Sequence, residues 1–391
     1  MRILMLLSNP FVTDARVYQE ALSLTKAGHR VTVLAFDKHP EKGLKEKEKV
    51  NGIRVVRFSP SICHRGLNQI LLKAKNVPLL KKMHGAHDLI VMREMWKDMA
   101  RRGMKGNFHA VHCHDLDTLP AGVMLKDKLD IPLVYDSHEI FPWMLSGWLP
   151  SWIVKRFSSM EKRMAPLADS IITVTPIHEH YFKKLKCKNV VIVTNCKRVP
   201  TERYLPSPCE PPYKLLYIGN LRSGRMILDA MKVCSRLEEW HIQIGGYGHL
   251  EEAIAGYSGN GVEYIGAIKP EEVLHRTLNC DLVLALYDPS NPNNRVGPSN
   301  KLFEAMACGR PCVVATGTYA SSVVEKEQCG YSINYSSEAL ATLLKQLAAN
   351  PQQMGLKGKN ALICAKEKYN WEIQETRLTR LYETLKREVG R

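Results

Sequence analysis

Short apolar runs rich in β-branched residues alternate with segments of helical period along almost the whole chain. In the first half, the runs that predict strands are 2–7, 30–36, 53–58, 88–92, 109–112, 132–135, 170–174 and 190–193. The segments between them that predict helices include 13–27, 67–83, 116–127 and 151–166. This alternation favours mostly parallel sheets covered by helices on both faces, because parallel strands need a crossover connection.

A Pro-rich segment interrupts the alternation. Five prolines lie within 197–212, and proline fits neither a helix interior nor a central strand. Beyond it, strand-like runs lie at 213–218, 240–245, 262–266, 281–286 and 311–315, and helical segments lie at 337–349, 354–368 and 371–388. We therefore expect an α/β fold with two doubly wound, Rossmann-like domains that bind ligands at the carboxyl ends of their strands, in the cleft between them. The predicted parts are a first domain 1–196, a linker 197–212, a second domain 213–370 and a terminal helix 371–391 that returns to the first domain.

Composition supports two buried cores and excludes several classes of protein. The chain has 391 residues, of which 45% are hydrophobic and 24% are charged. Its opening apolar run stops at Ser8-Asn9-Pro10, too early for a signal sequence, and no run approaches the roughly 20 apolar residues that span a bilayer. Eleven cysteines without a CxxC pair indicate reduced, buried thiols, among them Cys113, Cys280 and Cys312, in a cytoplasmic protein.

The net charge of +16 is concentrated in the first half of the chain. Residues 1–200 contain 33 Lys and Arg against 18 Asp and Glu, whereas residues 201–391 contain 22 against 21. This excess is either a solvated basic surface or a surface that meets an anionic partner, such as a lipid leaflet or a phosphorylated acceptor. We expect no nucleic acid as partner, because the sequence shows no RRM, KH or helix-turn-helix pattern.

The most specific local pattern is the run from Pro298 to Pro311. Pro298 and Ser299 are typical of a helix start, and Gly309 before Pro311 is typical of a helix end. The free amides and positive dipole end at Ser299, Asn300, Lys301 and Leu302 form an anion site, and Glu304 lies one turn further along. The simpler interpretation is a capped surface helix whose Glu304 only forms a salt bridge.

Two glycine-rich turns follow the strands predicted at 213–218 and 240–245. Gly219 allows close backbone approach, and Arg222 and Arg225 offer donors to phosphate oxygens. Gly246 lies in the second turn, and Ile268 follows the next predicted strand. Two arginines in a turn are also common on an ordinary solvated surface.

Titratable residues follow two consecutive strands of the first half. His112 ends the run at 109–112 and His114 follows it. Asp136, His138 and Glu139 follow the run at 132–135. We expect His114 to face the ligand cleft and His112 to alternate toward the interior. Arg16, near the start of the first predicted helix, either meets a phosphate or pairs with Asp14.

The run from Pro298 to Pro311 resembles the C-terminal signature of the family 4 glycosyltransferases. These are retaining, nucleotide-sugar-dependent enzymes of the GT-B fold, and the resemblance extends over nearly the whole chain. It implies a UDP- or GDP-linked sugar as co-substrate, with the diphosphate on the helix amides near Ser299, Asn300 and Lys301 and the ribose on Glu304. Val296 stands where the family often has a second Glu.

The resemblance also suggests roles for the remaining candidate residues. Arg222 and Arg225 correspond to a diphosphate clamp, and His114 corresponds to a residue near the reacting end of the donor sugar. Gly246 and Ile268 lie in loops that frame the nucleobase. The acceptor and sugar side comprises Arg16, Asp136, His138 and Glu139. No cofactor or metal is implied, in keeping with the lack of a DxD-type carboxylate pair in the second half.

The implied acceptor is a glycan, a lipid-linked or a polysaccharide-precursor molecule. Segment 141–157 contains three tryptophans with Lys155 and Arg156, which suits either a membrane-interfacial segment at the inner face of a membrane or a helix packed on its own domain. Two other functions remain open. One is a catalytically decayed scaffold that binds an anionic ligand or nucleic acid, and the other is a nucleotide-sugar 2-epimerase.

Overall fold

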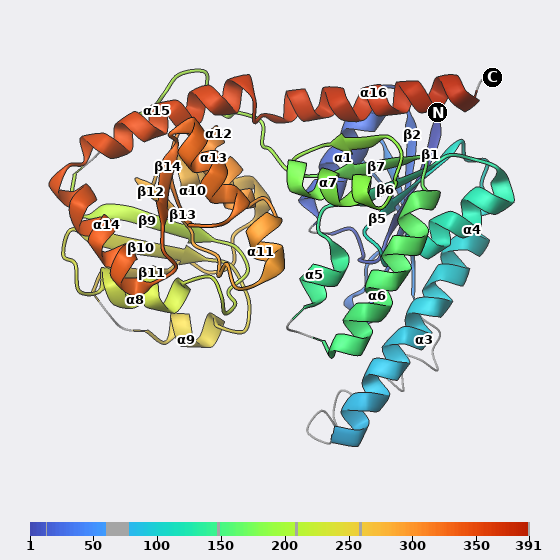
Figure 1. Ribbon diagram of the computed structural model, residues 1–391, viewed down its shortest axis with the longest axis horizontal. Coiled ribbons are helices and arrows are strands. Elements are labelled where there is room, and N and C mark those ends of the chain that lie inside the picture. Colours follow the sequence, from blue (N-terminus) through green and yellow to red (C-terminus); the bar gives the residue numbers. More distant parts are fainter. Residues whose placement is uncertain (13, 60–77, 147–148, 208–209, 258–259, 390–391) are drawn as a thin grey trace. The chain divides into compact units, whose positions relative to one another are not determined.

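The protein is described here by a computed structural model that covers residues 1–12, 14–59, 78–146, 149–207, 210–257 and 260–389 (Figure 1). The chain divides into two compact units. The first comprises Met1–Leu145, Leu149–Val193 and Glu375–Arg391, and the second comprises Thr194–Gln374 with the short segment Ser146–Trp148.

The first unit is built on an eight-stranded sheet of order β3-β4-β2-β1-β5-β6-β7-β8. Its strands are β1 (Arg2–Leu7), β2 (Arg30–Phe36), β3 (Lys47–Val50), β4 (Ile53–Phe58), β5 (Ala110–His114), β6 (Leu133–Ser137), β7 (Ser170–Thr173) and β8 (Val190–Ile192). All neighbouring strands run parallel except β3, which pairs antiparallel with β4. The parallel sheet confirms the fold class that the alternating sequence predicts.

The helices of the first unit are α1 (Ala15–Lys26), α3 (Pro78–Gly103), α4 (Leu119–Leu129), α5 (Phe141–Leu145), α6 (Ser151–Met164) and α7 (Pro176–Lys184), with short 3-10 turns at Pro40–Lys42 and Ala165–Leu167. Asp14 caps α1 by accepting a hydrogen bond from the amide of Val17, and Thr175 caps α7 in the same way through His178.

Alternation along the strands sends neighbouring side chains to opposite faces of this sheet. Val111 and Cys113 of β5, with Tyr135 of β6, join an apolar core that also contains residues of α3, α4, α6 and α7. His112, His114 and Asp136 occupy the alternate positions and therefore belong to the other face. That face is packed against α1 and the terminal helix.

One predicted strand is wrong, and part of one prediction lies outside the described residues. The run 88–92 lies inside α3, where Met92 and Trp96 pack against the core and Met95 and Met99 are buried. Their spacing of three and four residues is helical, but a five-residue apolar run alone does not distinguish a strand from a helix. Of the helix predicted at 67–83, residues 67–77 are not among those described.

The second unit contains a wholly parallel six-stranded sheet of order β11-β10-β9-β12-β13-β14. Its strands are β9 (Tyr213–Ile218), β10 (Trp240–Gly245), β11 (Val262–Tyr264), β12 (Leu282–Ala285), β13 (Cys312–Ala315) and β14 (Gly330–Ile333). Its helices are α8 (Ile227–Cys234), α9 (Glu251–Ala255), α10 (Pro270–Leu278), α11 (Pro292–Val296), α12 (Asn300–Ala307), α13 (Tyr319–Glu327), α14 (Ser337–Ala349) and α15 (Gln352–Glu367). The sequence analysis missed the edge strands β3 and β14.

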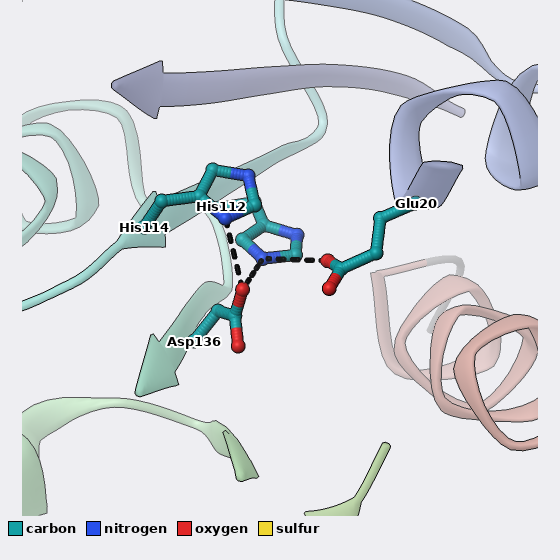
Figure 2. A group of neighbouring side chains, drawn as sticks. All are labelled: Glu20, His112, His114 and Asp136. Atoms are coloured by element: carbon teal, nitrogen blue, oxygen red, sulfur yellow. Dashed lines mark hydrogen bonds and ion pairs between the residues drawn. The ribbon is translucent and has the colours of Figure 1, made fainter. Parts of the chain in front are cut away.

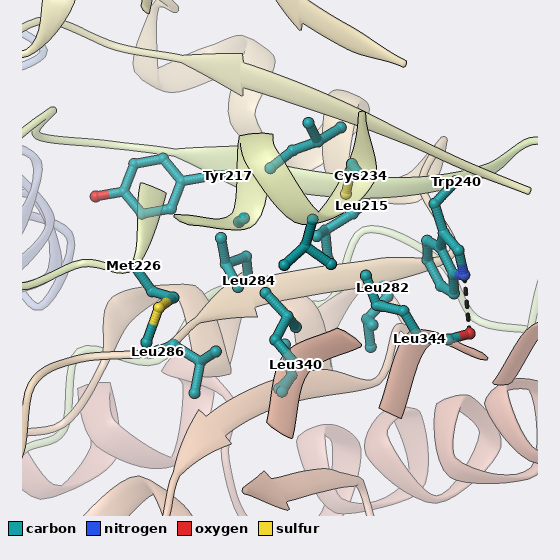
Figure 3. Close-up of a cluster of buried hydrophobic side chains, with 14 of the residues drawn as sticks. Leu215, Tyr217, Met226, Cys234, Trp240, Leu282, Leu284, Leu286, Leu340 and Leu344 are labelled. Carbon is teal, nitrogen blue, oxygen red and sulfur yellow. Dashed lines mark hydrogen bonds between the residues drawn. The ribbon is translucent and has the colours of Figure 1, made fainter. Parts of the chain in front are cut away.

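Apolar cores cover both faces of the second sheet. Figure 3 shows one of them, in which leucines of β9, β12 and α14 pack together and Trp240 lies at one side of the group. The indole Nε1 of Trp240 donates to the carbonyl oxygen of Leu344 at 2.9 Å, which satisfies its only polar atom. The other core contains Phe303 and Met306 of α12 packed under β12 and β13. This packing fixes the position of α12, whose N-terminus carries the predicted anion site.

The Pro-rich segment expected as a linker is counted within the second unit. Arg310 donates to the carbonyl oxygen of Leu205 at 2.7 Å, and the ring of Tyr204 lies against Gly309 and Gly358. The terminal helix α16 (Trp371–Val389) begins in the second unit and belongs to the first from Glu375 onward. Among the described residues, no helix is long and apolar enough to cross a membrane.

Candidate functional sites in the two units

The N-terminus of α12 has the form that the sequence predicts. Ser299 is the N-cap residue, with extended backbone angles and 2% exposure, and the helix begins at Asn300. Its side chain makes no capping hydrogen bond, so the first amides of the helix are not satisfied by their own cap. Asn300 is exposed, whereas Leu302 is anchored in the core. The amide of Leu302 already donates to the carbonyl oxygen of Ser299 at 3.0 Å. Among the described residues, the amides of Asn300 and Lys301 therefore remain as the helix donors for an anion.

Lys301 is the most unusual residue of this region, because its side chain is only 7% exposed. Its ammonium lies 4.4 Å from the ring centre of Tyr217 and 3.4 Å from the hydroxyl of Tyr287. Burial works against the charge, but the two tyrosines nevertheless raise the pKa of Lys301. The sequence analysis named Lys301 but missed both tyrosines, although Tyr217 lies near the carboxyl end of β9 and Tyr287 soon after β12.

Arg225 contacts the ring of Tyr287, the tyrosine whose hydroxyl lies near Lys301. Its guanidinium carbon lies 3.5 Å from the ring centre of Tyr287, and its Nη1 lies 3.5 Å from Oδ1 of Asn294. Burial opposes ionisation of the phenol, but the two cations lower the pKa of Tyr287. In the described part of the chain, no carboxylate forms an ion pair with Lys301 or Arg225. Arg222 lies three residues away in the same turn and is partly buried.

Gly219 and Gly246 stand where a neighbouring group comes too close to the backbone for a side chain to fit. Gly219 has φ +150° and lies so near Lys301 that an added Cβ would be 2.5 Å from the ammonium. Gly246 has φ +133°, and an added Cβ there would lie 1.9 Å from the carbonyl oxygen of Gly219. The two predicted turns therefore touch. Ile268 is also adjacent, since its side chain lies against Gly245.

Glu304 is 14% exposed and forms an ion pair with Lys197, whose ammonium lies 3.4 Å from Oε1. The salt bridge of the simpler interpretation is therefore present. This salt bridge uses Oε1, so the second carboxylate oxygen of Glu304 can still accept a hydrogen bond. Lys197 is a neighbour that the sequence analysis did not identify.

The titratable residues of the first unit form a buried cluster at the ends of β5 and β6 (Figure 2). His114 Nδ1 lies 2.9 Å from Oδ2 of Asp136, and His138 Nε2 lies 2.7 Å from the same oxygen. All three side chains are at most 3% exposed. Burial alone would raise the pKa of Asp136, but the facing imidazoles hold it well below its usual value. Burial opposes the charge on His138, yet Asp136 raises the pKa of His138 to about 9.

His112 does not point away from His114, so that expectation is wrong. Residues two apart on a strand share a face, and the two imidazole rings stack with centres 4.3 Å apart. The Nδ1 of His112 lies 2.8 Å from the hydroxyl of Tyr382 in α16, and its Nε2 lies 3.7 Å from Oε2 of Glu20 in α1. The sequence analysis missed Glu20 and Tyr382. The only available signal was that each occupies the apolar stripe of an amphipathic helix.

Arg16 and Glu139 lie at the margin of this cluster. Arg16 forms an ion pair with Asp115 at 3.1 Å, a partner that the sequence analysis did not name. Its contact with a phosphate stays a prediction. Glu139 is partly buried, and its carbonyl oxygen accepts a hydrogen bond from Ser137 at 2.8 Å.

The aromatic segment 141–157 is divided between core and surface. Trp143 packs edge-on against Tyr181 with ring centres 5.6 Å apart, whereas Trp152 is 61% exposed. Lys155 and Arg156 are exposed on the same side of α6 as Trp152. Trp148 lies outside the described residues.

Two family models match the chain and together cover both units. The model described as Glycosyltransferase Family 4 matches residues 15–196, and the model described as Glycosyl transferases group 1 matches residues 212–350.

Curated proteins and solved structures are also similar to this chain over most of its length. A glycogen synthase of Mycobacterium tuberculosis is 21% identical over 291 residues, which are 71% of this chain and 69% of that protein. Sucrose-phosphate synthase from Thermosynechococcus elongatus superposes with a TM-score of 0.76 at 16% identity, covering 98% of this chain and 99% of that chain. The Anabaena protein HepE, solved with UDP-glucose, superposes with a TM-score of 0.68 at 15% identity, covering 98% and 100%.

Proposed function

Because the chain belongs to the GT-B glycosyltransferases of the Glycosyltransferase Family 4 and Glycosyl transferases group 1 families, we propose that it transfers a sugar from a UDP- or GDP-linked donor with retention of anomeric configuration. UDP is the favoured nucleotide of the donor, since the Anabaena protein was solved with UDP-glucose. The acceptor is a hydroxyl of a glycan, a lipid-linked or a polysaccharide-precursor molecule.

The observation that carries this proposal is the pair of cations on the face of Tyr287. Lys301 and Arg225 lie close together and partly or fully buried, with no carboxylate partner among the described residues. Lys301 is buried and Arg225 is partly buried, and like charges beside one tyrosine repel each other, so an anion bound near both would be favourable. The free amides of α12 lie beside Lys301 and favour the same kind of ligand. A nucleoside diphosphate supplies the required charge.

In this proposal, the same groups act during the reaction. When the bond between the anomeric carbon and the phosphate oxygen breaks, negative charge develops on the β-phosphate. Lys301, Arg225, Arg222 and the α12 amides stabilise that charge, and no metal is required for this step. The acceptor hydroxyl forms the new bond from the leaving-group face, and its proton passes to the departing phosphate oxygen. Glu304 binds the ribose hydroxyls.

His114 orients the donor sugar in the proposed mechanism. Its Nδ1 is held by Asp136 at 2.9 Å, which fixes the plane of the ring, and its Nε2 has no hydrogen-bond partner among the described residues. An imidazole fixed in this way offers one nitrogen to a sugar hydroxyl. Asp136, His138, Glu139 and Arg16 then support or line the acceptor and sugar side.

The direct test is release of UDP or GDP from a panel of nucleotide sugars, with and without candidate acceptors. We expect Arg225→Ala and His114→Ala each to lower turnover at least tenfold. Arg236→Ala changes an exposed arginine of the second unit and should have no effect. Unchanged turnover in both site variants would contradict the assignment. Product analysis with donor alone is a second arm, because conversion of the sugar without an acceptor would indicate an epimerase.

We also propose that the acceptor is presented at an anionic membrane surface. Trp152 is 61% exposed, and Lys155 and Arg156 are exposed beside it on α6, a combination that suits an interface between headgroups and acyl chains. Flotation with anionic vesicles at low salt should recover the wild type but less of Trp152→Ser. Absence of the wild type from the vesicle fraction would end this part of the proposal.

A further inference from the structure

A set of metal-binding side chains lies in the first unit, on three separate elements. We call Glu20 of α1, His112 and His114 of β5, and Asp136 of β6 the buried tetrad (Figure 2). One ligand atom from each of the four lies within 4.8 Å of those of the others, and all four residues are at most 1% exposed. The tetrad is remote in sequence from the cations of the second unit, and nothing in the proposed transfer reaction uses Glu20 or His112.

The distances in the tetrad are near those of a metal site. His112 Nε2 lies 3.7 Å from Oε2 of Glu20 and 3.7 Å from Oδ2 of Asp136. His114 Nδ1 lies 2.9 Å from the same Asp136 oxygen. Ligands bound tetrahedrally at about 2.1 Å from zinc lie about 3.4 Å from one another. The observed separations lie on both sides of that value, so small side-chain rotations would complete the coordination.

Hydrogen bonds alone leave the tetrad incompletely satisfied. In the described part of the chain, neither carboxylate oxygen of Glu20 accepts a hydrogen bond, and Nε2 of His112 has no partner either. His138 Nε2 lies 3.3 Å from Glu20 but makes its shorter contact, at 2.7 Å, with Asp136. Asp136 is also contacted by His114, whereas the nearest imidazole nitrogen to Glu20 is that of His138 at 3.3 Å. Burying a carboxylate without donors is costly, and coordination to a cation is one of the ways in which proteins remove that cost.

The outer contacts also suit a metal. Nδ1 of His112 and the hydroxyl of Tyr382 lie 2.8 Å apart. A metal at Nε2 would require the tautomer in which Nδ1 donates to that hydroxyl, because Nε2 then directs a lone pair toward the carboxylates. This is the usual arrangement of a metal-binding histidine, whose second nitrogen is hydrogen-bonded to a neighbouring group.

We propose that the buried tetrad binds one divalent transition-metal ion of the zinc type through two imidazoles and two carboxylates. Four protein ligands close a tetrahedral site, so the ion is structural. It joins α1 to β5 and β6, and through Tyr382 it reaches α16. His114 binds the ion through Nδ1 in place of its hydrogen bond to Asp136, so the ion then fixes the plane of the ring and Nε2 remains for the donor sugar. The site therefore does not depend on the proposed transfer reaction.

The test is the metal content of full-length protein from which any polyhistidine tag has been removed, measured by plasma mass spectrometry after growth with added zinc. We expect about one metal ion per chain and a content at least tenfold lower in Glu20→Gln. Glu161→Gln, which changes another fully buried carboxylate of the first unit, should keep the metal. Equal content in the wild type and Glu20→Gln would mean adventitious surface binding and would overturn the proposal.

A second measurement covers the case in which Glu20→Gln does not fold. Wild-type protein stripped of metal and titrated with Co²⁺ should develop the visible absorption bands of tetrahedral cobalt, and added Zn²⁺ should remove them. If the wild type carries no metal and gives no such bands, the tetrad is a hydrogen-bonded network only. Donor binding in the second unit would be unaffected by that result, so the two proposals fail separately.

Discussion

Glu161 is a fully buried carboxyl group of α6, and its replacement by Gln should change how stability depends on pH. The hydroxyls of Tyr135 and Tyr181 donate to its two oxygens at 3.0 and 2.7 Å. Burial nevertheless dominates and raises the pKa of Glu161 to about 7, compared with 4.5 for an ordinary Glu. The folded protein therefore keeps a proton that the unfolded chain releases above pH 4.5.

The sign and size of the effect follow from this difference. The raised pKa stabilises the fold fully below pH 4.5, and that contribution is lost as pH rises through 7. At about 1.4 kcal/mol per pKa unit, the loss is about 3 kcal/mol. Glu161→Gln keeps the shape of the side chain but cannot ionise. It should gain about 3 kcal/mol relative to the wild type between pH 4.5 and pH 8.

The assay is urea or thermal unfolding of both proteins at several pH values, followed by a probe in the first unit. For a unit of 150–250 residues, the gain corresponds to roughly 6–12 °C in the relative melting temperature. Glu179→Gln, at a partly exposed carboxylate paired with Lys183, is the surface control. A difference between Glu161→Gln and wild type that stays constant from pH 4.5 to pH 8 would refute the reasoning.

Two further predictions concern glycines. Gly219→Ala should weaken UDP binding about tenfold, measured by calorimetry, because the new Cβ would lie 2.5 Å from the Lys301 ammonium and the backbone angle would cost about 1–3 kcal/mol. Unchanged affinity would show that the ammonium does not bind the nucleotide. Gly122→Ala should lower stability by about 1–3 kcal/mol, although alanine favours helices, because its Cβ would lie 2.1 Å from Sγ of Cys113. A rise in melting temperature would contradict this.

Local pattern predicted the strands that form the centres of both sheets, but not their whole extent. Buried parallel strands read as continuous apolar runs, which is why β1, β2 and β9 match their predicted ranges. The edge strand β3, Lys47–Val50, is short and largely charged, so hydrophobicity gives no signal for it. The run 88–92 shows the opposite failure, because its apolar residues belong to a long helix.

The candidate sites show a similar division. Residues at a helix start or in a glycine turn, such as Ser299 and Gly219, could be named because each has a local backbone requirement. Tyr287 and Glu20 could not, because their contacts with Lys301 and His112 come from elements joined only by tertiary packing. The same limit explains why Asp115, 99 residues away, was not named as a partner of Arg16.

The measurement that tests the central claim most directly is calorimetric titration of UDP and GDP into the wild type, Lys301→Met and Lys357→Met. Lys357 is a matched control, because its ammonium also lies over a tyrosine ring of the second unit, 5.4 Å from the centre of Tyr331. We predict that one nucleotide binds the wild type, that Lys301→Met weakens binding at least tenfold, or about 1.4 kcal/mol, and that Lys357→Met leaves it unchanged. No binding of either nucleotide to the wild type, or equal affinity in Lys301→Met, would contradict a nucleoside diphosphate site on Lys301 and Arg225.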